Sequence, residues 1–146
     1  MASIRITKEF SFEAAHALAG YDGPCRNIHG HSYRLAVTVT GIPIDDPSSP
    51  KRGMIMDFSE LKIIMKAQVI DPMDHALILP SSLDIDGIRP LGETFSNVVV
   101  VDYQPTSENL LSDFARRIQS ALPAGVSLYS MTLRETATSY AEWFAE

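Results

Sequence analysis

The feature that most constrains this fold is a pair of segments in which apolar and polar residues alternate. Over residues 4–14 the even positions are mostly apolar and the odd positions polar. Over residues 29–41 the odd positions carry the apolar set, which begins with His29 and His31. A period of two is typical of strands that bury one face. Because residues 17–28 between them are rich in turn formers, we expect an antiparallel pair joined by a long loop.

The rest of the chain alternates between helical and strand patterns. A capping-box spacing that starts at Asp57, followed by apolar residues at helical intervals, predicts a helix up to Pro72. A second helix is predicted from Thr106 to a stop at Pro123. Further strands are expected at residues 98–101, 126–135 and 139–144, and loops at residues 41–53 and 80–92. This order favours one α+β domain over residues 1–146, with a mostly antiparallel sheet and helices on one face.

Scarce reactive residues and the net charge limit the function classes. The chain of 146 residues has one cysteine, Cys25, so a disulfide-built secreted domain is excluded and a cytoplasmic location is expected. Twelve Lys and Arg against 18 Asp and Glu give a net charge of −6, which disfavours nucleic acid as a partner. No segment has the pattern of a secretory signal or the length of a membrane span, so we expect no membrane association.

Three of the four histidines are expected to converge. His29 and His31 are two residues apart on one strand and therefore project from the same face, and His16 extends the buried face of the preceding strand. In an antiparallel pair these faces coincide near the connecting loop. Three imidazoles with a free fourth position are typical of an open zinc site. Separate, hydrogen-bonded histidines are the simpler explanation for any single one, but three together favour a metal.

Cys25 lies four residues before His29, and three interpretations are open. It is the fourth ligand of a structural zinc site, a free thiol beside an open site, or an inert buried thiol. Its loop contains Gly and Pro, which disfavours ordinary core packing. Asp74 and His75 follow the first helix as an adjacent acid and base, and an imidazole within reach of a thiol favours the thiolate. A surface turn is the simpler explanation of such a dipeptide.

Two carboxylates are candidate ligand-binding groups. Glu135 has the parity of Tyr129, Met131 and Leu133, so we expect it to point from the end of a strand into an apolar environment, where an unpaired carboxylate is costly. A ligand with two adjacent N–H donors would satisfy it in a fork-like geometry. Glu108 lies in the first turn of the second helix, where interaction with the helix dipole is the simpler explanation.

Six blocks of sequence together resemble the family of 6-pyruvoyl-tetrahydropterin and 6-carboxy-tetrahydropterin synthases. The blocks are F-S-F-E-A-A-H at 10–16, C-R-N-I-H-G-H-S-Y at 25–33, G-M-I-M-D-F-S-E-L-K at 53–62, M-D-H-A-L at 73–77, P-T-S-E-N-L at 105–110 and R-E-T at 134–136. They stand in the family's order and cover nearly the whole chain.

The resemblance implies a tunnelling fold, in which an antiparallel four-stranded sheet carries two helices on one face. Trimers would close their sheets into a barrel, and two trimers would stack into a homohexamer. Carried over position by position, the resemblance also implies the following roles: Zn²⁺ ligands at His16, His29 and His31, a general base at Cys25, a proton relay completed by Asp74 and His75, and pterin contacts from Glu135, Thr106, Ser107 and Glu108.

The substrate that the resemblance implies is 7,8-dihydroneopterin triphosphate. In the pyruvoyl branch triphosphate is eliminated with internal redox, whereas in the carboxy branch acetaldehyde is also released and the product feeds 7-deazapurine (queuosine) synthesis. Three residues separate Cys25 from H-G-H, as in bacterial carboxy enzymes, and animal pyruvoyl enzymes have a longer spacer. We therefore expect a zinc-dependent carbon–carbon lyase of the carboxy branch.

Three alternatives stay open: a pyruvoyl enzyme, a non-enzymatic module whose structural zinc is closed by one cysteine and three histidines, and a metal-free cysteine enzyme that uses Cys25 and His75. The segment 79–104 is longer than the family's usual connection before the second helix, which leaves subunit packing and triphosphate binding open.

Overall fold

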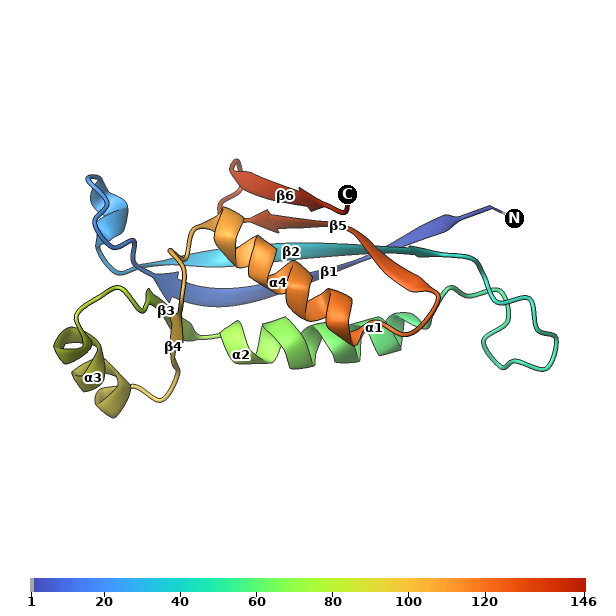
Figure 1. The fold of residues 1–146 in the computed structure, drawn as a ribbon, viewed down its shortest axis with the longest axis horizontal. Coiled ribbons are helices and arrows are strands. Elements are labelled where there is room, and N and C mark those ends of the chain that lie inside the picture. The colour runs from blue at the N-terminus through green and yellow to red at the C-terminus, as the bar shows by residue number, and fades with distance from the viewer. Residues whose placement is uncertain (1) are drawn as a thin grey trace.

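A six-stranded mixed sheet forms one layer of the molecule, and the long helices pack on one of its faces (Figure 1). The structure, a computed structural model, describes residues 2–146, apart from the side chain of Ile85. The strands lie in the order β4-β3-β1-β2-β5-β6. Their bounds are β1 (Ile4–His16), β2 (His29–Gly41), β3 (Ala76–Pro80), β4 (Val98–Val101), β5 (Val126–Arg134) and β6 (Tyr140–Phe144).

Both predicted helices are confirmed. The first is a continuous run of α1 (Phe58–Met65), the π-helical η2 (Lys66–Ile70) and α2 (Asp71–Met73). The second is α4 (Ser107–Ala121), which begins after Thr106, whose hydroxyl accepts a hydrogen bond from the Asn109 N–H. The remaining helical elements are η1 (Pro24–Arg26) and α3 (Ile85–Thr94). In the described part of the chain, no helix has both the length and the apolar character needed to cross a membrane.

The long β1–β2 pair is antiparallel, as predicted, and it sets the register of the site. His16 lies opposite His29 and Ala14 lies opposite His31. The same faces bury Phe12 and Tyr33, whose rings stack with centroids 5.0 Å apart, against side chains of the two long helical runs. Burying each large apolar side chain contributes about 1.5–3 kcal/mol. A slip of one residue would move this whole set to the opposite face, so core burial also fixes the histidines.

The expected antiparallel sheet of four strands is wrong. β3 pairs with β1 in parallel, and β4 pairs with β3 in parallel, so the sheet is mixed and has six strands. The strand at 98–101 was predicted, but β3 was not. Its residues Ala76, Ile78 and Leu79 are buried in succession with little alternation, and such a short apolar run carries no period that identifies a strand.

The expected loop at residues 80–92 is also wrong, since it contains most of α3. Asp84 caps this helix by accepting a hydrogen bond from the Asp86 N–H. Glycines and Pro90 within the helix weaken the helical signal and favoured a loop. Ile88 and Leu91 of α3 line an open, largely apolar pocket together with Ala17, Leu18 and Leu79.

Tyr129 does not share the core face of Met131 and Leu133. Thr38 pairs with Ser130 and Val39 pairs with Leu128, so Tyr129 is an extra residue in β5 at a register shift. The shift reverses the parity of β5, which keeps both Leu128 and Met131 buried.

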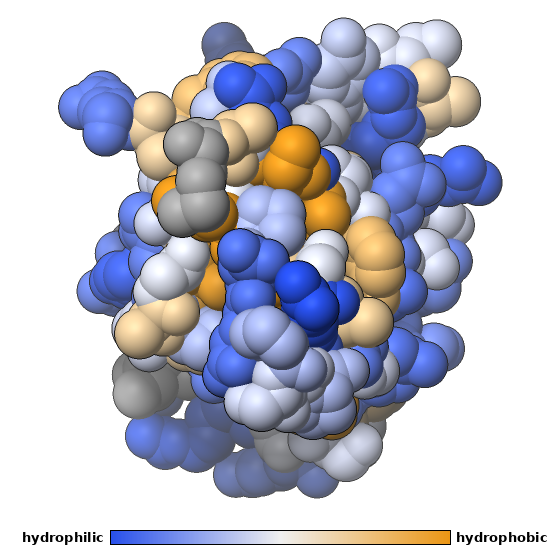
Figure 2. All heavy atoms as spheres, turned by 90° about the vertical axis from the view of Figure 1, so that its right-hand side faces the viewer, coloured by the Kyte–Doolittle hydropathy of each residue, from blue (hydrophilic) through white to orange (hydrophobic). Residues whose placement is uncertain are grey.

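Polar side chains dominate the end of the molecule that carries the N-terminus and the loop after β2, with apolar side chains between them (Figure 2). Ile4, Ile42 and Met54 are exposed large apolar residues of these segments. The histidines lie at the other end of β1 and β2, so this surface is remote from the site.

Candidate metal centre and adjoining pocket

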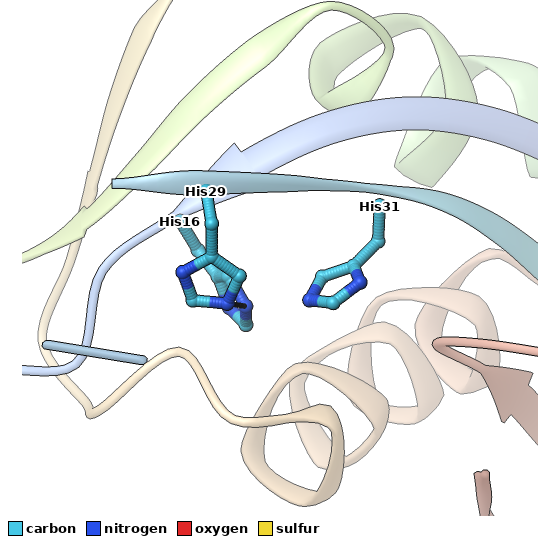
Figure 3. Close-up of side chains that lie close together, drawn as sticks. All are labelled: His16, His29 and His31. Carbon is cyan, nitrogen blue, oxygen red and sulfur yellow. Dashed lines mark hydrogen bonds between the residues drawn. The ribbon is translucent and has the colours of Figure 1, made fainter. Parts of the chain in front are cut away.

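The three histidines converge at the loop end of the β1–β2 pair, as predicted (Figure 3). The Nε2 atoms of His16 and His29 are 3.0 Å apart. One ring nitrogen from each of the three residues lies within 4.8 Å of the other two. The cluster needs no contribution from a flexible loop, because His16 and His29 are cross-strand neighbours and His31 is the next residue on the same face.

Backbone carbonyls fix the tautomers of two of the rings. The Nδ1 atom of His16 lies 2.6 Å from the Pro105 carbonyl oxygen, and the Nδ1 atom of His29 lies 2.7 Å from that of Asn27. A carbonyl oxygen only accepts hydrogen bonds, so both Nδ1 atoms carry the proton. In the neutral rings, the Nε2 lone pairs therefore face each other. Nε2 of His31 is buried and has no hydrogen-bond partner within residues 2–146.

This donor set fits a tetrahedral metal ion. Zinc–nitrogen bonds of about 2.0–2.1 Å place two ligand nitrogens roughly 3.3 Å apart in tetrahedral geometry. Facing lone pairs and an unpaired buried nitrogen are unfavourable unless a cation or a proton lies between them. Desolvation lowers the pKa of His16 and of His31 below the ordinary value, which keeps both imidazoles in the neutral form that metals bind.

A pocket of about 210 Å³ adjoins the three histidines His16, His29 and His31, which we call the triad. It gathers a thiol, two carboxylates and two hydroxyls of the expected site. The predicted residues on its wall are His16, Cys25, Thr106, Ser107, Glu108 and Glu135. Ser107 Oγ is buried beside this wall and has no hydrogen-bond partner among the described residues.

Glu135 occupies the side of the pocket nearest the triad. Its Oε1 atom lies 3.5 Å from Nε2 of His16 and 3.5 Å from Nε2 of His31. The prediction that Glu135 points inward from the end of β5 therefore holds, although its neighbours are imidazoles as well as apolar groups. Cys25 is half-buried in η1 and does not belong to the three-histidine cluster, which favours an open metal position over a closed one.

Asp74 and His75 pair with each other but do not line this pocket. Asp74 Oδ1 accepts a hydrogen bond of 2.9 Å from the Glu13 N–H, which holds the pKa of Asp74 below its ordinary value. The His75 side chain is 79% exposed and lies in an open depression beside Glu13 and Ser32, on the face of β1 and β2 opposite the triad. Its φ of +61° is rare for a residue with a Cβ atom and costs about 1 kcal/mol or more.

Several residues that shape the site were not predicted from the sequence. The Pro105 carbonyl orients His16, and a backbone carbonyl has no sequence signal. Ser139, Tyr140 and Ala141 close the pocket where β6 begins. The strand expected at 139–144 contained a signal for them, because the start of the last strand of a hairpin must lie beside the end of the strand before it.

The fold and the site together define a candidate metalloenzyme with an open coordination position. Residues 5–146 match the family described as 6-pyruvoyl tetrahydropterin synthase, and the chain belongs to this family. It is similar to the 6-carboxy-5,6,7,8-tetrahydropterin synthase of Haemophilus influenzae, with 37% identity over 141 residues that cover 95% of this chain and 97% of the relative.

Two further comparisons include the pyruvoyl branch. The chain is 33% identical to the 6-pyruvoyl tetrahydrobiopterin synthase of Pongo abelii, over 90% of this chain and 85% of the relative. The fold matches the solved structure of Caenorhabditis elegans 6-pyruvoyl tetrahydropterin synthase with a TM-score of 0.70 and 26% identity, over 100% of this chain and 98% of that one.

Proposed function

We propose that the chain is a zinc-dependent lyase that converts 7,8-dihydroneopterin triphosphate to 6-carboxy-5,6,7,8-tetrahydropterin, with release of acetaldehyde and triphosphate. The observation that carries the proposal is the open cluster of three histidines beside a pocket that also contains Cys25 and Glu135. The name of the Haemophilus relative and the three-residue spacer between Cys25 and the H-G-H motif support the carboxy branch.

The metal would be held by His16, His29 and His31. When bound, Zn²⁺ supplies Lewis-acid polarisation of the substrate's side-chain hydroxyls. The carbonyls of Pro105 and Asn27 hold two of the rings with Nε2 directed at the centre, as outer partners of metal ligands do.

Glu135 would anchor the pterin ring. Its carboxylate is partly buried in the pocket wall, and the 2-amino and N3 hydrogens of a pterin form the adjacent pair of donors that a carboxylate accepts best. Ser107 Oγ offers a further hydrogen bond from the same wall, where Thr106 and Glu108 add polar contacts. Together these groups would fix the ring so that its side chain extends toward the triad.

Cys25 would remove carbon-bound protons from the side chain. Cys25 lines the pocket, which would put its thiol within reach of a substrate bound there. Within one chain, Asp74 and His75 lie on the opposite face of the sheet, and the relay to Cys25 would be completed between copies of a homohexamer. The exposed ring of His75 suits this role because it is free to enter the pocket of a neighbouring copy.

The proposal is tested by incubating the protein with 7,8-dihydroneopterin triphosphate, followed by mass analysis of the pterin and an assay for acetaldehyde. We expect stoichiometric acetaldehyde and 6-carboxytetrahydropterin from wild type and no product from Cys25→Ala. A reduced pterin without acetaldehyde would assign the pyruvoyl reaction instead. No consumption of substrate by zinc-loaded protein would overturn the proposed activity.

Metal analysis of the same two proteins separates the remaining alternatives. We expect Cys25→Ala to keep its zinc and its fold, because the thiol is not part of the ligand cluster. Loss of zinc and of stability together would identify a structural site of one cysteine and three histidines. Turnover by wild type from which all metal has been removed would leave the metal-free cysteine enzyme.

A further inference from the structure

One side chain joins the loop that carries Cys25 to the segment before α4. The amide of Gln104 makes two hydrogen bonds with the backbone of Ala19: its Oε1 accepts from the Ala19 N–H at 2.9 Å, and its Nε2 donates to the Ala19 carbonyl at 2.8 Å. Both polar groups of the amide and both polar groups of Ala19 are satisfied by this contact. A paired contact of this kind fixes orientation as well as distance.

The contact is linked to Cys25 through the backbone of the loop. Leu18, the neighbour of Ala19, donates its N–H to the Cys25 carbonyl at 3.0 Å. Ala19, which Gln104 binds, is therefore linked to Cys25 through one backbone hydrogen bond. The other described hydrogen bonds of residues 19–28 are local to the loop or its ends. Gln104 therefore provides the polar attachment of this loop to a segment that is distant in sequence.

Gln104 itself lies beside residues that contact the metal centre and the pocket wall. The Gln104 carbonyl accepts hydrogen bonds from the Thr106 N–H at 2.8 Å and from Nδ2 of Asn109 at 3.0 Å, which fixes the start of α4. The next residue, Pro105, is buried, and its carbonyl orients the ring of His16. One residue thus contacts both the thiol loop and the support of a metal ligand.

We propose that Gln104 is a positioning residue that sets the placement of Cys25 relative to the zinc centre. The role rests on the proposed function. The histidines come from strands whose register is set by the core, so they keep their places when the contact of Gln104 with Ala19 is removed. Only the loop, and with it the thiol, loses its fixed distance from the reacting carbon, and misplacement by about 1 Å costs roughly 100-fold in rate.

The test uses Gln104→Met, which has a similar length and shape but no hydrogen bonds to Ala19. Gln104→Glu keeps the acceptor for the Ala19 N–H and loses the donor. The matched control is Gln119→Met, at an exposed position of α4. Because Cys25 is the only thiol of the chain, its alkylation by iodoacetamide reports on that site alone.

We expect Gln104→Met to keep the wild-type zinc content while kcat falls about 10- to 100-fold and KM changes little. Alkylation of Cys25 should become faster by about threefold or more, because the half-buried thiol is released from its place. Gln104→Glu should also be impaired in both measurements, because its second carboxylate oxygen faces the Ala19 carbonyl oxygen, and Gln119→Met should match wild type.

Wild-type kcat and wild-type alkylation in Gln104→Met would overturn the inference. Loss of zinc in both Gln104 variants would overturn it as well. Gln104 would then support the structure of the metal centre itself, and its role would not be limited to placing the Cys25 loop. The alkylation measurement does not require turnover. If wild type proves inactive on the proposed substrate, the proposed function fails, while the alkylation rates still decide whether Gln104 positions the thiol.

Discussion

Within residues 2–146, His16 and Asp113 are the buried polar residues, and the clusters around them differ in whether their hydrogen-bonding groups are paired. In the first, the Nε2 atoms of His16 and His29 face each other, and Nε2 of His31 has no hydrogen-bond partner among the described residues. In the second cluster, Asp113 of α4 is 5% exposed and accepts hydrogen bonds from Tyr103 at 2.5 Å, Arg116 at 2.7 Å and Arg117 at 2.9 Å. The second cluster is complete without a ligand, whereas the first is not.

The electrostatics of the two clusters follow from this difference. Burial acts to raise the pKa of Asp113, but hydrogen bonds from Arg117, Tyr103 and Arg116 outweigh it and lower the pKa below its ordinary value. The carboxylate is therefore stabilised where it lies. At the triad, burial lowers the pKa of His16 and His31, so the protein keeps neutral donors next to each other at a cost in stability. A self-satisfied cluster serves the fold, whereas an unsatisfied one is maintained for a ligand.

The largest effect is expected from His29→Ala. Structural zinc sites with four ligands bind with about 10–16 kcal/mol, so one ligand contributes roughly 3–4 kcal/mol and its removal weakens zinc binding by about 100- to 1000-fold. Competition with a chelator measures this loss. The metal-free variant should be at least as stable as metal-free wild type, because the His29 lone pair that faces the His16 lone pair is removed. A large loss of stability would mean that the triad serves the fold after all.

Asp113→Ala is the matched change in the second cluster. It leaves two guanidinium groups and a hydroxyl without their acceptor, and we expect the free energy of unfolding to fall by about 2–3 kcal/mol. The estimate is below that for a fully buried pair because Arg116 is 77% exposed and is solvated in the variant. Urea unfolding measures the loss. Zinc content should be that of wild type, and a reduced content would contradict the separation of the two clusters.

Tyr103→Phe should have a smaller effect of the same kind. It removes one hydrogen bond to a charged group that keeps two other donors, so the free energy of unfolding should fall by about 1–2 kcal/mol. The same urea titration tests this. A loss as large as that of Asp113→Ala would show that the hydroxyl, rather than the two arginines, holds the cluster together.

The smallest expected effect concerns the pH range in which each cluster changes the stability of the metal-free protein. His16 and His31 have lowered pKa values, so the unfolded chain binds protons first, and stability falls as the pH drops below 6.5. Asp113 also has a lowered pKa, but its stabilisation is lost only as the pH drops below 3.8. In urea titrations between pH 3 and 8, His31→Gln should reduce the first slope and Asp113→Asn only the second. Equal effects of the two variants in one range would remove the distinction.

The parts of the site that follow from local periodicity were predictable from the sequence. A period of two places His16, His29 and His31 on one face, and the register of an antiparallel pair brings that face together. The position of Asp74 and His75 was not predictable, because it depends on β3, whose apolar run lacks alternation. The two bonds of Gln104 to Ala19 join segments that are distant in sequence, and a glutamine before a helix carries no signal for such a partner.

The parallel pairing of β3 with the end of β1 also has a kinetic consequence. Ala14 and Ala76 pair across a long stretch of chain that includes the whole first helical run, whereas β1 and β2 are joined by a single loop. Contacts between residues so far apart in sequence raise the contact order. Closing such a long loop costs chain entropy, so these contacts form after contacts between residues that are closer in sequence. The hairpin that carries the histidines can therefore form early, and the segment that holds Asp74 and His75 docks on it late in folding.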